Sequence, residues 1–246
     1  MTMRPLSAAE LLDIWDRGIT QTSVERALTL LAAAHAESSV EALAQLSIGQ
    51  RDGLLLRLRE WTFGPQFVSL ASCPGCGNRL ELAFGVNDLR TQAAAEADGE
   101  LVVNVAGYMV RFRLPNSLDL IVLGGGADLT AVRRLLLKRC LLQIQSNGVE
   151  TSSEVLPVEV MDAIAGCMAE ADPQADVRLA LICPRCGHRW QAAFDIGAFF
   201  WREIEAWAER TLRQVHLLAT RYGWRERDIL AMSARRRQWY LNLVSG

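Results

Sequence analysis

The stretch "SCPGCGNRLELAF" at residues 72–84 returns as "ICPRCGHRWQAAF" at residues 182–194. Aligned without gaps, residues 73–84 and 183–194 agree at seven of twelve positions, namely Cys, Pro, Cys, Gly, Arg, Ala and Phe. The shared Arg, Ala and Phe lie outside the cysteine loop, so they indicate a duplicated hairpin with a common packing plan. Apolar residues that alternate around each loop predict a strand, a cysteine turn and a second strand.

The spacing within each loop is typical of a metal-binding turn. Two cysteines separated by two residues can place both sulfurs about 2.3 Å from one zinc ion. The Pro stiffens the turn, and the Gly after the second Cys permits a positive φ that lets backbone N–H groups point at the thiolates. Because structural zinc takes four tetrahedral ligands, each loop supplies half a site. We therefore expect one Zn²⁺ bound by Cys73, Cys76, Cys183 and Cys186.

A thiol redox role is the alternative reading of the cysteine pairs. A reactive Cys-x-x-Cys motif places its first Cys at a helix N-terminus, where the helix dipole lowers the thiol pKa. Strand-like residues follow both loops here, and this favours metal. The other two cysteines, Cys140 and Cys167, lie on helical stripes and are expected to be small buried hydrophobic residues.

Composition and charge narrow the class of protein. Of the 246 residues, 50% are hydrophobic and 22% are charged, which predicts a folded chain with a real core. The net charge of −2 gives no global basic field for nucleic acid or an anionic membrane. Charges or glycines interrupt every apolar run, so no membrane insertion is expected. The N-terminal residues lack the pattern of a secretory signal, so we expect a cytoplasmic protein with reduced thiols.

The predicted fold class is α+β, mainly helical, with the two CPxCG zinc-knuckle β-hairpins joined in one zinc-ribbon-like antiparallel sheet. The segments are expected to form one integrated domain. They are an N-terminal helical region (1–66), the first zinc-knuckle hairpin with a second hairpin (67–127), a helical connector (128–170), the second zinc-knuckle hairpin (171–197) and a C-terminal helical region (198–246).

Local signals support this division. Four capping boxes, in which a Ser or Thr precedes a Glu or Gln by three residues, predict short helices near the N-terminus. These are Ser7 with Glu10, Thr22 with Glu25, Ser38 with Glu41, and Ser47 with Gln50.

Ala106 and Gly107 supply the turn of the second hairpin. The glycine-rich run 123–128 lacks the Lys of a P-loop and is interpreted as a hinge. An apolar stripe predicts one long helix from Phe199 to Tyr222.

No catalytic constellation is evident, so we do not expect an enzyme. The three histidines lie at unrelated places, and no Gly-x-Ser-x-Gly or His-Glu-x-x-His pattern occurs. The C-terminal region instead combines six arginines with aromatic residues, as interface hot spots do. The candidate partner-binding residues are Trp224, Arg225, Arg235, Arg236, Trp239 and Tyr240. A nucleic-acid groove, or a solvated basic face with its aromatics packed inward, would use the same residue types.

Several longer motifs occur in a distinctive order. They are "ELLDIWDRG", "LSIGQRDGLLLRLREWTFGPQF" ahead of "CPGCGNRLEL", "VRFRLPNSLDL", "CPRCGHRW", "FFWREIEAW" and "YGWRERDILAMSARRRQWYL". In this order the chain resembles the T-even phage baseplate hub assembly chaperone family, found in tailed phages and bacterial contractile injection systems. The resemblance covers most of the chain, with weaker support for residues 128–180.

The resemblance implies a role in building or joining the baseplate of a contractile tail, with other baseplate or hub proteins as partners and no catalytic residues. The family's paired cysteines match the four expected zinc ligands, and its aromatic and arginine tail matches Trp224, Arg235, Arg236 and Tyr240. The predicted function is thus a non-enzymatic, zinc-stabilised protein-binding factor in baseplate assembly or architecture. The alternative is a zinc-ribbon nucleic-acid-binding protein, which the acidic net charge disfavours. The sequence leaves open which subunit is bound, whether the protein stays in the finished particle, and which oligomeric state it has.

Overall fold

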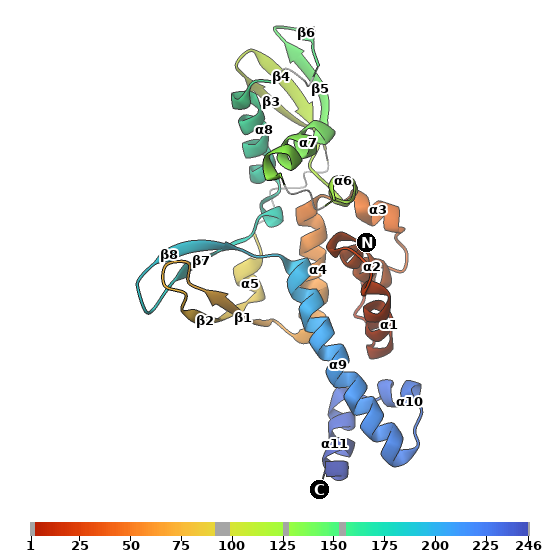
Figure 1. Ribbon diagram of the computed structural model, residues 1–246. Helices are drawn as coiled ribbons and strands as arrows, with labels where there is room; N and C mark the ends of the chain where they lie inside the picture. Colours follow the sequence, from red (N-terminus) through yellow and green to blue (C-terminus); the bar gives the residue numbers. More distant parts are fainter. Residues whose placement is uncertain (1–2, 92–98, 125–127, 153–155, 246) are drawn as a thin grey trace. The chain divides into compact units, whose positions relative to one another are not determined.

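The computed structural model describes residues 3–91, 99–124, 128–152 and 156–245 (Figure 1). The chain divides into two compact units. The first, called the helical unit, combines Met1–Ser38 with Ile196–Gly246. The second, called the hairpin unit, is the intervening stretch Ser39–Asp195, which contains both cysteine motifs.

The helical unit is built around one long helix. Its elements are α1 (Ala8–Gly18), α2 (Ser23–Ala34), α9 (Ile196–Tyr222), α10 (Glu226–Leu230) and α11 (Ala234–Ser245). The other four helices all contact α9. One apolar core of this unit consists of Leu12, Ala208, Val215, Leu218, Ile229, Leu230 and Leu241. The expected long helix is confirmed, and it begins three residues before Phe199 because Ile196 is itself buried.

Glycine at the end of α1 has a packing role. Helix α1 ends at Gly18. A Cβ atom at this position would lie only 2.0 Å from the ring of Trp201, which is buried on α9. Gly18 therefore both ends α1 and makes room for an indole ring from α9.

Three of the four expected capping boxes are present, at the starts of α1, α2 and α4. The fourth, Ser38 with Glu41, is wrong by one residue. Ser39 caps α3 instead, and its hydroxyl accepts a hydrogen bond from the N–H of Ala42 at 3.2 Å. The N–H of Ser38 bonds back to the carbonyl of His35, so Ser38 still belongs to the preceding turn.

The hairpin unit alternates helices with short strands. Its helices are α3 (Val40–Gln45), α4 (Ile48–Phe63), α5 (Val86–Leu89), α6 (Ser117–Leu123), α7 (Leu129–Cys140) and α8 (Val158–Ala171), with a 3₁₀ turn at Pro173–Ala175. Its strands are β1 (Gln66–Ser72), β2 (Arg79–Gly85), β3 (Leu101–Val105), β4 (Tyr108–Phe112), β5 (Leu141–Ser146), β6 (Val149–Glu150), β7 (Arg178–Ile182) and β8 (Arg189–Ala193). The class is therefore mixed, with small antiparallel sheets, as expected.

The sheets correct one part of the expected fold class. Both cysteine hairpins form, as β1–β2 and β7–β8, but each is a separate two-stranded sheet. They are not hydrogen-bonded into one antiparallel sheet. The two hairpins contact each other through side chains, namely the cysteine sulfurs and the phenylalanine rings, and their backbones do not pair.

A four-stranded sheet in the order β3-β4-β5-β6 corrects a second expectation. The range 128–170, expected to be a helical connector, is helical only in α7 and α8, and β5 and β6 lie between them. Asn147 and Gly148 both adopt positive φ and close the β5–β6 turn. The expected hinge at 123–128 falls partly outside the described residues.

Helices α7 and α8 complete a core with this sheet (Figure 1). Its buried members are Val110, Phe112, Leu114, Leu137, Cys140, Ile144, Val160, Ile164 and Met168. Cys140 is fully buried there, as expected, and burial raises the pKa of its thiol to about 11. The other cysteine outside the two motifs, Cys167, is half-buried on α8.

Candidate metal centre

Each cysteine motif folds into a tight turn at the tip of its hairpin. In the first hairpin the N–H of Cys73 donates to the carbonyl of Asn78 at 2.9 Å, and the N–H of Gly77 donates to the carbonyl of Cys73 at 2.8 Å. Gly77 has φ +70°, a left-handed conformation that glycine adopts without strain. The sequence Cys-Pro-x-Cys-Gly thus closes on itself through two backbone bonds.

The second turn repeats these bonds. The N–H of Cys183 donates to the carbonyl of His188 at 2.9 Å, and that of Gly187 donates to the carbonyl of Cys183 at 2.9 Å. The φ of Gly187 is +72°, close to that of its counterpart in the first turn. The sequence duplication is therefore a duplication of backbone structure.

The four cysteine sulfurs converge on one point. The Sγ atoms of Cys73 and Cys186 are 3.7 Å apart, as are those of Cys76 and Cys183. All four sulfurs lie within 4.8 Å of one another. A tetrahedron of sulfurs about 2.3 Å from a central metal has edges of about 3.8 Å, whereas a disulfide would need about 2.05 Å. The donor set and its spacing therefore fit a tetrahedral thiolate site, and the four cysteines could hold a metal ion.

The protonation of the thiols follows from their surroundings. For Cys183, desolvation is outweighed by hydrogen bonds from the backbone of Cys186 and Arg185, which lower the pKa of its thiol to about 7. For Cys186, a backbone bond from His188 lowers the pKa, but contacts with the other sulfurs raise it to about 12. Four adjacent thiols cannot all ionise on their own, because like charges repel. A bound dication would supply the missing positive charge.

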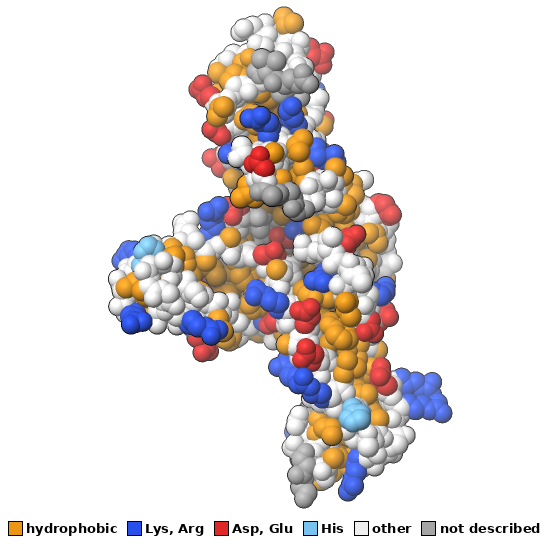
Figure 2. All heavy atoms as spheres, viewed as in Figure 1, with side chains coloured by type: hydrophobic (Ala, Val, Ile, Leu, Met, Phe, Trp, Pro, Cys, Tyr) orange, Lys and Arg blue, Asp and Glu red, His pale blue; other side chains and the backbone are white. Residues whose placement is uncertain are grey.

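One half of the cluster is more accessible than the other. Cys73 and Cys183 are buried, whereas Cys76 and Cys186 are exposed. The two buried sulfurs come from different hairpins, so the base of the site joins both. Figure 2 shows basic side chains on the part that the hairpins occupy, and Arg79, Arg185 and Arg189, which lie within three residues of a cysteine in the sequence, are all exposed. Their charge complements that of a four-thiolate centre.

The hairpins also meet through His188. A Cβ atom on Gly75 would lie 3.1 Å from Cγ of His188, so the imidazole of the second turn rests on the backbone of the first. The same ring stacks near Trp190, with centroids 6.0 Å apart. The side chain of His188 is exposed.

An aromatic cluster joins the far ends of the same hairpins. Phe67 stacks on Phe84 with centroids 5.3 Å apart, and Phe194 meets both rings edge-on at 5.9 and 5.7 Å. The guanidinium of Arg59, buried on α4, lies 3.7 Å from the centroid of Phe67. The repeated Phe of the sequence motif was the signal for this cluster, but nothing in the sequence placed Arg59 there.

Most of the chain matches one known protein family. A family model described as "T4 bacteriophage base plate protein" matches residues 9–201. The chain belongs to this family. The match includes all four cysteines and both hairpins of this base plate protein. It ends within α9, so α10 and α11 lie beyond it.

No curated protein and no solved structure gives a significant match. In the described part of this base plate protein, no helix is both long and apolar enough to cross a membrane.

The expected partner-binding residues fall into two groups. Trp224 and Tyr240 are half-buried, with centroids 4.8 Å apart, and Tyr222 stacks on Trp224 at 4.5 Å. Arg225, Arg235, Arg236 and Trp239 are exposed. The structure thus combines a packed aromatic cluster with an outward basic face, and partner binding by these six residues stays a prediction.

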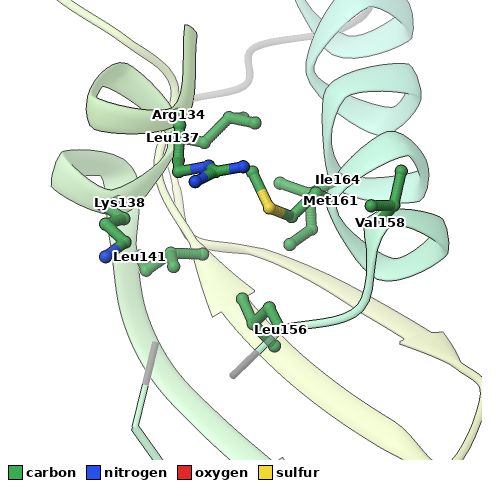
Figure 3. A pocket seen from close by; sticks show the side chains of 8 residues that line it. All are labelled: Arg134, Leu137, Lys138, Leu141, Leu156, Val158, Met161 and Ile164. Atoms are coloured by element: carbon green, nitrogen blue, oxygen red, sulfur yellow. The ribbon is translucent and has the colours of Figure 1, made fainter. Parts of the chain in front are cut away.

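A pocket of about 200 Å³ lies between α7 and α8 of the hairpin unit (Figure 3). Cofactor and drug-sized ligand sites usually have volumes of about 300–1,000 Å³, so this one is small for such a ligand. The described lining residues are Arg134, Leu137, Lys138, Leu141, Leu156, Val158, Met161 and Ile164. Six are apolar and two are basic, and the pocket is separate from the cysteine cluster in its lining.

Proposed function

We propose that this base plate family member is a non-enzymatic architectural or assembly protein of a contractile tail or contractile injection system, held in shape by zinc. The observation that carries the proposal is the convergence of four cysteine sulfurs from two hairpins. A site with four thiolate ligands has no open coordination position for a substrate, which is the arrangement of structural zinc. Membership in the base plate family supports a structural role.

Zinc is the ion that the proposal names. Tetrahedral thiolate sites favour zinc or an iron–sulfur centre, because both accept soft sulfur ligands. Zinc adds no redox chemistry, and a clamp between two hairpins requires none. In this role the four cysteines fix segments that lie 107 and 113 residues apart in the chain. Closing loops of that length restricts the unfolded chain, so the bound ion stabilises the native state.

The partners in this proposal are other base plate or hub proteins. The resemblance of the sequence to hub assembly chaperones supports a role in the cytoplasm while the particle is built. It can leave after assembly or stay in the finished particle. Neither role needs catalysis, and the cysteine centre as described offers only positioning.

Elemental analysis with native mass spectrometry tests the zinc clamp. One zinc per monomer is expected, and Cys73→Ser should abolish stoichiometric binding. The matched control is Cys167→Ser, which removes a thiol of the same unit outside the cluster. A protein that purifies with no metal and rejects added zinc would refute the clamp. Iron in place of zinc would overturn the choice of ion.

Association with the particle is tested separately. The chain should co-sediment with base plate intermediates in cells that build the contractile particle. Its absence from every intermediate would contradict the proposed role.

Nucleic-acid binding is a second candidate function. The exposed arginines around the cysteine turns, Arg79, Arg185 and Arg189, are the observation that favours it. Phosphate contacts should then give salt-sensitive binding that is strongest at about 50 mM salt. The net charge of −2 makes this the weaker candidate. Absence of binding to duplex DNA and single-stranded RNA at that salt concentration would eliminate it.

A further inference from the structure

Helix α11 has one buried and one outward face. Leu241 and Arg237 are 7% and 5% exposed and face the core of the helical unit. Trp239 and Leu243 are 68% and 61% exposed. Because residues four apart lie on the same side of a helix, these two side chains form one apolar stripe. Arg235 lies one turn before Trp239 on the same side of the helix and adds a positive charge to this stripe.

An exposed tryptophan on an ordered helix is unusual. Tryptophan is highly buried on average, and exposed apolar side chains that adjoin one another often mark interaction sites. No described residue covers Trp239 closely enough to bury it. The stripe therefore has the composition of a binding anchor, a large aromatic followed one turn later by Leu.

The stripe lies on a positively charged helix. Arg235 and Arg236 are exposed, and Ala234–Ser245 contains no acidic residue. A helix face with this charge is complementary to an acidic surface.

The stripe is held on a fixed support. The guanidinium of Arg236 lies 5.8 Å from the ring centroid of Tyr240, and Tyr240 meets Trp224 edge-on. Residues 234–244 are helical over the whole stripe. Binding would therefore require little ordering of α11, and a preorganised anchor binds more tightly.

We propose that the outward face of α11, formed by Arg235, Trp239 and Leu243, docks as a helix into an apolar groove with an acidic rim on another protein of the particle. This inference rests on the proposed function and names the chemistry of the partner. The helix lies beyond the base plate family match, which ends at residue 201. Repulsion among its own arginines disfavours a second copy of this chain as the occupant.

The test uses the full-length protein and base plate intermediates purified from cells that lack it. Binding is titrated at about 50 mM salt in two parallel series, one without and one with nuclease. Trp239→Ala should weaken binding at least about 30-fold, as for an interface hot spot. Arg235→Glu should weaken it about tenfold, with a smaller salt dependence. The matched controls are Leu217→Ala and Arg210→Glu on α9, both at exposed positions, which should bind like the wild type.

The outcomes separate the two proposals. If the wild type fails to bind, the proposed function fails and the docking inference falls with it. If the wild type binds and both α11 variants bind equally well, the docking inference is overturned and the proposed function stands. Loss of binding on nuclease treatment would assign the surface to nucleic acid and also overturn the inference. Circular dichroism and thermal unfolding confirm that each variant is folded.

Discussion

Phe84 and Phe194 occupy the same position in the two copies of the cysteine motif, and their rings meet edge-to-face with centroids 5.7 Å apart at 89°. The duplication has thus placed two copies of one residue in contact. The same holds for the cysteines, whose short sulfur distances join one hairpin to the other. The hairpins are linked at both ends, by sulfur at the tips and by aromatic rings at the base.

Removing one ring should loosen this link. We expect Phe194→Ala to reduce the free energy of unfolding by about 2 to 4 kcal/mol, because it removes apolar burial and two aromatic contacts. Urea unfolding followed by circular dichroism measures the change. Ile182→Ala, at a 56% exposed position in the same hairpin, should change it by less than about 0.5 kcal/mol. In a double-mutant cycle with Phe84→Ala, an interaction energy of zero would show that the rings are not coupled.

Metal removal should destabilise the hairpin unit. A strong zinc chelator is expected to lower the unfolding temperature by several degrees or more, because ion binding is coupled to folding. Readdition of zinc should restore it. Cys76→Ser should reproduce the effect of the chelator and make the protein insensitive to it, whereas Cys167→Ser should keep the wild-type response. An unchanged unfolding temperature after complete metal removal would contradict a structural role.

Two glycines should respond in opposite directions to the same substitution. Gly18→Ala places a Cβ atom in the ring of Trp201 and should destabilise the helical unit by about 1 to 3 kcal/mol. Gly166 lies within α8, where an added methyl group would meet no described atom within 4 Å, so Gly166→Ala should stabilise by about 0.5 to 1 kcal/mol. Thermal unfolding compares the two, and equal shifts of the same sign would contradict the packing described for Gly18.

Asp52 should make stability depend on pH. Burial raises the pKa of Asp52 to about 6, although Arg51 lies 2.8 Å away and opposes this, while the nearby charges of Asp195 and Asp172 raise it further. Because the folded-state pKa lies above the unfolded value, the stabilisation is present below about pH 4 and is lost as the pH rises through about 6.

The measurement is the unfolding free energy of the wild type relative to Asp52→Asn. This difference should fall by about 2 to 3 kcal/mol between about pH 4 and pH 7. The variant Asp13→Asn, at an exposed position on α1, serves as the control. A difference that is constant with pH would show that Asp52 titrates at its ordinary pKa.

The hairpins and the cysteine cluster could be predicted because their signals are local. Two residues between cysteines, a glycine after them and alternating apolar flanks describe the whole turn, and the duplication shows which turns belong together. The capping boxes are equally local, and the one error, at Ser38, arose because the adjacent Ser39 can cap as well.

The failures concern contacts between distant segments. Strand β5 follows α7 without a break, and only its pairing with β4 distinguishes "LLQIQS" from a continued helix. The two cysteine hairpins form separate sheets because no edge strand of one pairs with an edge strand of the other. Pairing between strands so far apart in the chain leaves no local signal in the sequence. Likewise, the inward packing of Trp224 and the outward position of Trp239 depend on which side of α11 meets α9.

The helical unit is assembled from both ends of the described chain, with the hairpin unit inserted between them. During translation, Ser39–Asp195 leaves the ribosome before Ile196 and the residues after it. The hairpin unit can therefore fold, and bind the proposed zinc, while α1 and α2 still lack α9, the helix they pack on. The order of synthesis thus allows the cysteine site to form before the arginine-rich helix α11 leaves the ribosome.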